Sequence, residues 1–308
     1  MQLVAGDGRN PARGYLLVAV GATMFALGGN IARYMLDDGV SATRLSQLRS
    51  AGSLVLLAIA LALTKPHLMR VRRRDVPQLA FLGICGLALV HATYYAAIDR
   101  LEIGVALVIQ YMAPLLLLVW LRFRHGRRLA PNLWGAVALS IAGCALVVRA
   151  YDPGALDGKG VLYAAGAAVT FAIYMVASER AGHRYESVTT LLWAFAFATV
   201  FWSVVEPWWT FPFGRVDVLY GLGVIIVGTL LPFICVVAAL RHLPAPRAAV
   251  AATLEPVLAA VFAWWLHDEH LALVQLTGGA LVLGAVLWVQ SHRPDLEAEL
   301  APPLKEAR

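Results

Sequence analysis

The chain has 308 residues, of which 60% are hydrophobic and only 14% charged, and its mean hydropathy is +0.71. A soluble chain carries roughly a quarter charged residues, so this composition excludes an ordinary soluble globular protein. The net charge of +6 does not indicate a nucleic-acid partner, because the basic residues lie at the ends of long apolar stretches.

These apolar stretches predict membrane-spanning helices. Each is about 20 residues long, the length of α-helix that crosses a bilayer core of roughly 30 Å. Strands of a membrane barrel would be about 10 residues long and would alternate in polarity, and the stretches do neither. We therefore predict an all-α polytopic membrane protein with ten transmembrane helices, at residues 15–35, 44–63, 76–98, 103–121, 132–149, 160–178, 187–206, 217–240, 247–266 and 272–290.

The segments before, between and after the predicted spans are short. The first span follows Arg9 and Arg13 and is too long for a signal-peptide core, so we expect it to be retained. The connections between spans are short and leave no room for a soluble domain. Residues 291–308 carry several prolines and mixed charge, which predicts a disordered cytoplasmic tail.

The distribution of Lys and Arg predicts the orientation. If the N-terminus is cytoplasmic, most basic residues fall on the cytoplasmic side, including the runs Arg70–Arg74 and Arg122–Arg128. Few, such as Arg100 and Lys159, then fall outside. An even number of spans returns the C-terminus to the cytoplasm. We expect a multi-pass inner-membrane protein that contacts the lipid bilayer and has both termini cytoplasmic.

The two halves of the sequence repeat. The alignment that places Pro114 on Pro256 also matches Leu101 with Leu243, Gly86 with Gly228 and His125 with His267. A slightly different offset matches Gly14 with Gly160 and Phe25-Ala26 with Phe171-Ala172. Each half holds five spans, an odd number, so the second copy must enter the membrane from the opposite face. This predicts two inverted five-helix repeats, at 14–150 and 160–290, with a substrate site near the midplane between them.

Several short runs resemble a known family. Thr253-Leu254-Glu255-Pro256-Val257, followed by Glu269 and Gly278, resembles the second repeat of EamA-type transporters of the drug/metabolite transporter superfamily. Ala113-Pro114 resembles the partner motif in the first repeat, and Phe171-Ala172-Ile173-Tyr174 resembles the sixth helix. The resemblance implies ten helices, a central cavity between the repeats, and export or exchange of amino acids and other small metabolites. The chain departs from the family at Arg127, where an acidic residue is common.

Two charged residues inside the spans are the first candidates for substrate binding. A charge at the centre of a spanning helix costs about 2.5–3.5 kcal/mol on insertion scales, so it needs a reason. Glu255 lies near the predicted midplane and either binds substrate or a proton, or pairs across helices. Arg49 is its candidate counter-ion, and a fixed structural ion pair between them is the alternative.

Pro114 and Pro256 occupy matched positions and predict a pair of broken helices. Proline has no N–H, so each frees the carbonyl four residues earlier, at Gln110 and Ala252. A freed carbonyl at membrane depth needs a partner or a wet cavity. A packing kink is the alternative interpretation.

Polar and aromatic side chains within the spans form the remaining candidate site. For any one of them, an interhelical hydrogen bond is as good an explanation as ligand contact, and His91 alone is better explained as a core histidine. Together they predict an aromatic-walled cavity suited to an amino acid or a similar zwitterion. These residues are Asn30, His91, Tyr94, Tyr95, Gln110, Tyr111, Thr170, Tyr174 and Thr253.

Other patterns predict no further chemistry. His267-Asp268-Glu269-His270 lies in a short exposed loop, which disfavours a metal site, and we expect neither metal nor cofactor. The three cysteines lie inside apolar spans without ligand spacing. The small-residue pairs Ala138/Ala142 and Ala280/Gly284 predict close packing of the fifth and tenth helices, with a homodimer interface as the alternative.

These observations predict a secondary transporter, an exporter or exchanger of small metabolites that works by alternating access at a midplane cavity. An intramembrane enzyme is one alternative, but the sequence has no HExxH or GxSxG motif. A non-transporting membrane scaffold is the other, and it would not need midplane charges. No nucleotide-binding loop is present, so ATP-driven transport would need another chain. Because the catalytic motifs are missing, we expect no enzymatic activity.

Overall fold

The computed structural model describes residues 10–98, 100–101, 103–124, 131–147, 157–211, 217–267 and 272–291. Within these ranges the regular structure is helical and contains no strand. The expected tail, apart from Ser291, and most of the His267–His270 cluster lie outside the described residues. The prediction of an all-α membrane protein is confirmed.

Long and shorter helices follow one another in groups along the chain. The long helices are α1 (Pro11–Asp37), α2 (Ala42–Thr64), α7 (Pro131–Val147), α8 (Gly158–Gly182), α9 (Ser187–Val205) and α14 (Leu273–Ser291). The shorter ones are α3 (Val76–Phe81), α4 (Leu89–Ile98), α5 (Ile103–Gln110), α6 (Ala113–Arg124), α10 (Val218–Ile225), α11 (Leu231–Ala239), α12 (Ala245–Ala252) and α13 (Leu254–His267).

Six helical stretches of the described chain are long and apolar enough to cross a membrane. They are Pro11–Leu36, Ala42–Thr64, Arg73–Ala97, Gly158–Gly182, Ser187–Val205 and Val218–Ala239. Shorter apolar helices at Ala113–Phe123, Leu133–Leu146 and Leu273–Trp288 lie beside them.

Side-chain caps fix where several of the helices begin. Asn10 accepts a hydrogen bond from the Arg13 amide at the start of α1, and Asp157 accepts one from the Lys159 amide at 2.7 Å at the start of α8. Asp217 caps α10 in the same way. Each cap satisfies a backbone N–H that the first helical turn leaves unpaired.

Two composite helices contain a π-helical segment. The segment η3 (Leu82–Ala88) joins α3 to α4, and η6 (Ile226–Leu230) joins α10 to α11. A π segment adds a residue to the turn and interrupts the regular hydrogen bonds, a distortion found frequently at functional sites. Gly86 and Gly228, matched in the sequence, lie one in each segment.

Two further composite helices are interrupted. The α5 helix ends at Gln110 and α6 begins at Ala113, next to Pro114. The α12 helix ends at Ala252 and α13 begins at Leu254, so Thr253 alone separates them. Both interruptions lie within the four residues before a proline, where the missing N–H removes a helical hydrogen bond.

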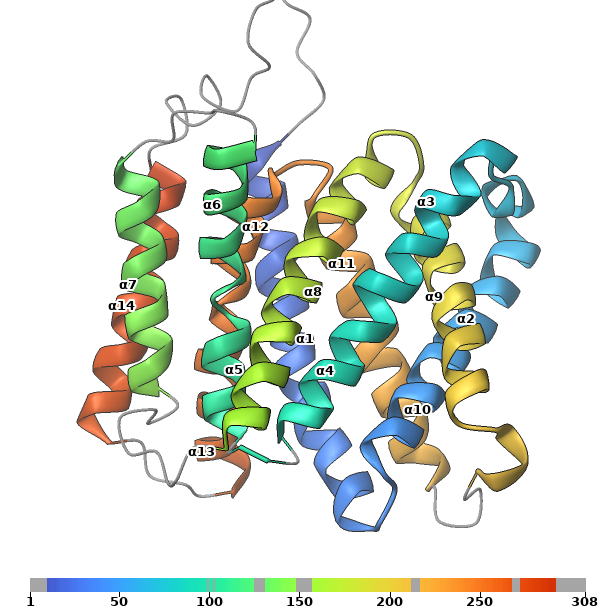
Figure 1. Ribbon diagram of the computed structural model, residues 1–308, viewed down its shortest axis with the longest axis horizontal. Coiled ribbons are helices and arrows are strands. Elements are labelled where there is room, and N and C mark those ends of the chain that lie inside the picture. The colour runs from blue at the N-terminus through green and yellow to red at the C-terminus, as the bar shows by residue number, and fades with distance from the viewer. Residues whose placement is uncertain are drawn as a thin grey trace, which may run out of the picture.

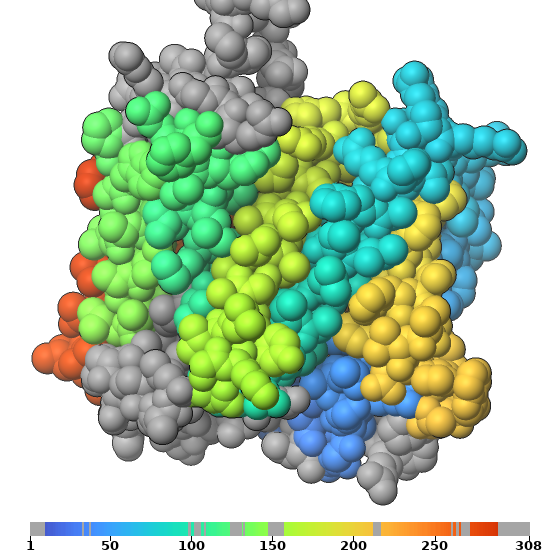
Figure 2. All heavy atoms as spheres, viewed as in Figure 1, coloured from blue at the N-terminus to red at the C-terminus, as the bar shows by residue number. Residues whose placement is uncertain are grey.

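The helices form a bundle with α1 and α8 at its centre (Figure 1). The α1 helix packs against α10 to α13, whereas α8 packs against η3, α4, α5 and α6. At one edge α2 packs on α9, and at the opposite edge α7 packs on α14. The space-filling view shows α8 reaching the surface between α6 and the α3–α4 helix (Figure 2).

The α7–α14 pair is as close as the sequence predicts, but it uses other residues. A Cβ added at Gly143 would lie 2.7 Å from the Gly278 carbonyl oxygen and 2.8 Å from Val282, so only glycine fits between these helices. Ala138, Ala142 and Ala280 are exposed instead. The expectation that these small residues mediate the packing is therefore wrong: the three alanines are exposed, and a Cβ at Gly284, the fourth predicted residue, would meet no neighbouring atom within 4 Å.

Candidate substrate cavity

A cavity of about 380 Å³ lies inside the bundle, lined by residues from both halves of the chain. Its walls come from α1, α2, η3, α4, α5, α8, η6, α11, α12 and α13. Gly28 of α1 and Gly228 of η6 meet at this wall so closely that a Cβ on Gly28 would lie 2.1 Å from the Gly228 Cα. The two backbones are in direct contact there, which only a pair of glycines permits.

Arg49 lies in the cavity wall and joins α2 to two other helices. Its Nε donates to Thr229 Oγ1 at 2.8 Å and its Nη2 donates to the Gly228 carbonyl at 2.8 Å, both in η6. Its Nη1 donates to the Tyr95 hydroxyl at 3.0 Å. A guanidinium has five N–H groups, so these three bonds leave two for a ligand.

Glu255 enters the cavity from the second residue of α13. Its Oε2 accepts a hydrogen bond of 2.8 Å from the Tyr111 hydroxyl, which lies at the interruption between α5 and α6. The carboxylate of one interrupted helix is thus held by the hydroxyl of the other. This bond leaves the second carboxylate oxygen for a ligand.

Arg49 and Glu255 line the same cavity without pairing. In the described part of the chain no ion pair joins them, because Arg49 bonds only to uncharged oxygens and Glu255 to a tyrosine. The fixed Arg49–Glu255 ion pair considered from the sequence is therefore not formed. Both charges face the cavity with hydrogen-bonding capacity left over.

Aromatic rings form the rest of the wall, and they gather around Phe233. Its ring contacts Phe25 at 5.0 Å, Tyr174 at 5.5 Å and His91 at 6.1 Å between ring centroids, all edge to face. This geometry is favourable for aromatic pairs. Phe233 was not among the residues predicted from the sequence to line a cavity, because it is apolar. The repeat alignment matches its position with that of His91.

Three buried polar atoms of cavity-lining residues have no hydrogen-bond partner among the described residues. They are Nδ1 of His91, Oε1 of Gln110 and the hydroxyl oxygen of Tyr174. Buried polar atoms in native proteins almost always have a partner, so an unpaired one at a cavity needs explaining. A bound polar ligand or water would supply the missing partner.

The structure brings together eight of the nine residues predicted to bind substrate. Asn30, Arg49, His91, Tyr94, Gln110, Tyr111, Tyr174 and Glu255 all line the cavity. Thr253 does not: it is fully buried, donates to the Val250 carbonyl and accepts a 2.7 Å hydrogen bond from Ser140 of α7. Pro114 and Pro256 are buried and lie outside the cavity lining.

Membrane-spanning helices around an internal cavity with polar and charged walls define a membrane transporter of small molecules. The sequence model of the EamA-like transporter family matches residues 12–149 and again residues 158–290. The chain belongs to this family, as the resemblance of its motifs predicted.

Relatives of known name are transporters too. The threonine/homoserine exporter RhtA of Escherichia coli strain K12 is 28% identical over 264 residues, covering 81% of this chain and 79% of the exporter. An uncharacterized transporter of Archaeoglobus fulgidus is 28% identical over 218 residues, covering 70% of this chain and 78% of its own length. One solved crystal structure shares the fold, with a TM-score of 0.74 at 18% identity over 91% of this chain and 97% of its own. The predicted transport of small metabolites is confirmed.

Proposed function

We propose that the chain crosses the inner membrane ten times, as two inverted five-helix repeats at 14–150 and 160–290. Equivalent contacts in the two halves support this proposal. A Cβ at Gly14 would lie 2.6 Å from Leu243, and a Cβ at its repeat partner Gly160 would lie 2.7 Å from Leu101, the partner of Leu243. Each half also holds one π segment and one interrupted helix. The family model matches once in each half.

In this arrangement both termini are cytoplasmic. Reporter fusions after Arg74 and Arg128 are expected to read cytoplasmic, and a fusion at Asp157 is expected to read external. An external signal at Arg128 would contradict the ten-span arrangement. The exposed small residues Ala138, Ala142 and Ala280 remain a candidate face for a homodimer.

The proposed substrate is an amino acid or a similar small zwitterion, exported or exchanged by alternating access. The observation that carries this proposal is the pair of unpaired opposite charges in one cavity. Glu255 would accept from the substrate ammonium, and the two remaining N–H groups of Arg49 would donate to its carboxylate. The similarity to an exporter named for threonine and homoserine supports this class of substrate.

The cavity size and chemistry agree with this class. A volume of about 380 Å³ is at the small end of ligand pockets and suits a molecule of amino-acid size. His91 Nδ1 and Gln110 Oε1 would bond the polar side chain of such a substrate. A proton carried by Glu255 is the second candidate role, because its carboxylate is the one acidic group among the described cavity-lining residues.

A flux assay in proteoliposomes tests the proposal. Purified protein is reconstituted, loaded with one labelled amino acid at a time, and efflux is followed with and without a pH gradient. Saturable efflux of an amino acid, lost when the amine or the carboxylate is blocked, is the expected result. Flux that is indifferent to blocking either group would reject recognition by Glu255 and Arg49. The absence of flux for a broad metabolite panel would favour a membrane scaffold or intramembrane enzyme.

A further inference from the structure

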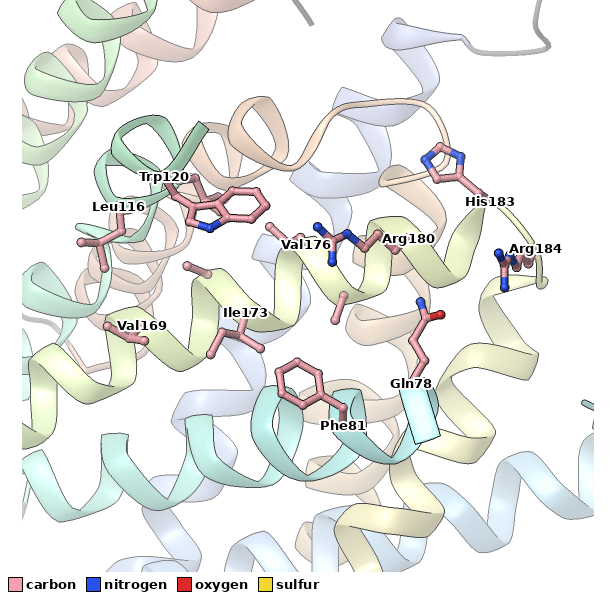
Figure 3. Close-up of a pocket in the computed structure, with 13 residues that line it drawn as sticks. Gln78, Phe81, Leu116, Trp120, Val169, Ile173, Val176, Arg180, His183 and Arg184 are labelled. Atoms are coloured by element: carbon pink, nitrogen blue, oxygen red, sulfur yellow. The ribbon is translucent and has the colours of Figure 1, made fainter. Parts of the chain in front are cut away.

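A second, larger cavity lies on the outer face of the bundle and shares no lining residue with the substrate cavity. It has a volume of about 820 Å³ and follows α8, with α3 and α6 on either side (Figure 3). Phe81, Trp120 and Val169 line it and are exposed. They belong to helices that we assign to the membrane, so this groove opens toward lipid.

The groove is polar at one end only. Along most of its length it is lined by aliphatic and aromatic side chains such as Leu116, Ile173 and Val176. Its polar residues, Gln78, Arg180, His183 and Arg184, gather at the end where α8 finishes and α3 begins (Figure 3). A hydrophilic metabolite does not fit such a wall, whereas an amphiphile with a single polar head does.

The length of the groove matches one leaflet of a bilayer. From Val169 to Arg180, α8 rises about 16 Å, at 1.5 Å per residue. Half of the hydrocarbon core of a bilayer is about 15 Å thick. An acyl chain lying along α8 therefore reaches the midplane when its headgroup lies beside Arg180.

Two of the three basic residues at the polar end, Arg180 and His183, are available to an anion. The Arg180 guanidinium lies 5.8 Å from the centroid of the Trp120 ring, which holds it over the groove, and it forms no ion pair within the described chain. His183 is exposed at the end of α8. Arg184 is instead bound to Asp75 at 2.8 Å, and Tyr185 donates to the same carboxylate, so this pair neutralises itself and braces α3 against α8.

From this charge and length complementarity, we infer that the α3–α6–α8 groove binds an anionic phospholipid. Its phosphate lies between Arg180 and His183, and one acyl chain lies along α8 over Ile173 and Val169. A basic pocket between membrane helices on the cytoplasmic side is a known setting for anionic headgroups, and Arg180 lies on that side in the proposed orientation. The inference depends on the groove and not on the identity of the transported substrate.

Native mass spectrometry of the purified full chain in detergent tests the inference. The protein is titrated with phosphatidylglycerol or phosphatidylcholine carrying the same palmitoyl and oleoyl chains, and with glycerol phosphate, which has the headgroup charge without the chains. The variants are Arg180→Gln, Arg180→Lys, and Ile173→Trp, which fills the groove. Arg241→Gln is the matched control, because Arg241 lies near the same ends of the helices but pairs with Glu186 outside the groove.

The unmodified protein is expected to retain phosphatidylglycerol in preference to phosphatidylcholine. Arg180→Gln should lower phosphatidylglycerol binding about fivefold, as expected for one basic residue at a membrane surface. Arg180→Lys and Arg241→Gln should leave it unchanged, and Ile173→Trp should reduce binding of both lipids. Size-exclusion profiles and melting temperatures identify any variant that fails to fold.

Three results would overturn the inference. Equal binding of the two lipids by the unmodified protein would remove the role of the phosphate charge. Binding of glycerol phosphate as strong as that of phosphatidylglycerol would assign the basic end to a free phosphate. A dimer that dissociates only in the Ile173→Trp variant would assign the groove to a second copy of the chain.

Discussion

The two interrupted helices, α5–α6 and α12–α13, share a backbone design but present different chemistry. At the first, Tyr111 points to the cavity and Ala113 beside Pro114 is an uncharged buried residue. At the second, Thr253 turns away to Ser140, and Glu255 beside Pro256 carries the charge. The two breaks meet through the Tyr111–Glu255 hydrogen bond. The two breaks thus share a backbone design and differ in the polar groups that they present to the cavity.

The largest effect on transport is expected from neutralising Glu255, the charged residue at the α12–α13 break. Glu255→Gln keeps shape and hydrogen bonding but cannot ionise. A hydrogen bond to a charged group contributes about 1.5–3 kcal/mol, so efflux at low substrate concentration should fall roughly ten- to a hundredfold. Proteoliposome efflux measures this, with Glu186→Gln as a control acid outside the cavity.

The pH gradient separates the two roles of Glu255. If the carboxylate binds the ammonium, the E255Q variant loses both gradient-driven flux and exchange at equal pH. If it carries a proton, only the gradient-driven flux is lost. Full activity of this variant at every pH would show that Glu255 takes no part in transport.

A smaller effect should distinguish the two prolines. Pro256→Ala restores an N–H at the break and permits a continuous helix, which would rotate the adjacent Glu255 away from Tyr111. Pro114→Ala acts next to Ala113, which has no charged group to displace. We expect Pro256→Ala to lower efflux more than Pro114→Ala, at equal amounts of protein in the membrane. Equal flux in both variants and the unmodified protein would reduce the breaks to packing kinks.

A smaller change again is expected at the hydrogen bond between the breaks. Tyr111→Phe keeps the ring and removes the hydroxyl that orients Glu255. The hydroxyl does not itself contact the substrate, so only part of the about 1.5–3 kcal/mol of a hydrogen bond to a charged group is lost from binding, and the apparent affinity should weaken roughly two- to tenfold. The concentration dependence of efflux measures it, and an unchanged half-saturation concentration would argue that Glu255 needs no such support.

Thr253 of the α12–α13 break is equivalent to Tyr111 in the repeat alignment, and substituting it should affect stability alone. Thr253→Val removes the acceptor of the buried Ser140 hydroxyl, and an unsatisfied buried group costs about 1–3 kcal/mol. We expect a lower melting temperature in detergent with unchanged flux per folded molecule. Impaired flux with an unchanged melting temperature would return Thr253 to the substrate site.

Polarity at membrane depth located most of the cavity from the sequence. It identified Glu255, Arg49 and their polar neighbours because such groups are costly in lipid unless they face a cavity or each other. It failed at Thr253, because a threonine hydroxyl can be satisfied within its own helix or by the next one, and the sequence does not say which face it takes. Phe233 was not predicted to line the cavity, because an apolar ring in an apolar span does not differ from its neighbours in polarity.

The length of the apolar spans predicted the all-α membrane fold, whereas it did not predict the details of helix packing. The interruptions lie where the prolines predict them, but the π segments have no comparable signal in the sequence. The small-residue pairs led to the wrong residues of α7 and α14. The glycines at the contact, Gly143 and Gly278, have no small residue four positions away in the sequence and therefore lie outside that pattern. Likewise the sequence predicted the Glu255 carboxylate as the partner of Arg49. In the structure the guanidinium donates instead to three neutral oxygens, those of Thr229, Tyr95 and Gly228.

The bonding of Arg49 also bears on how the protein enters the membrane during synthesis. Its acceptors come late in the chain: Tyr95 follows it by 46 residues and Thr229 by 180. When α2 leaves the translocon, the guanidinium therefore has none of its final partners. A charge at the centre of a helix costs about 2.5–3.5 kcal/mol to insert, and Arg49, the eighth of the 23 residues of α2, costs part of that. The apolar second half of α2, from Leu54 to Leu63, must offset that cost until the last third of the protein is made.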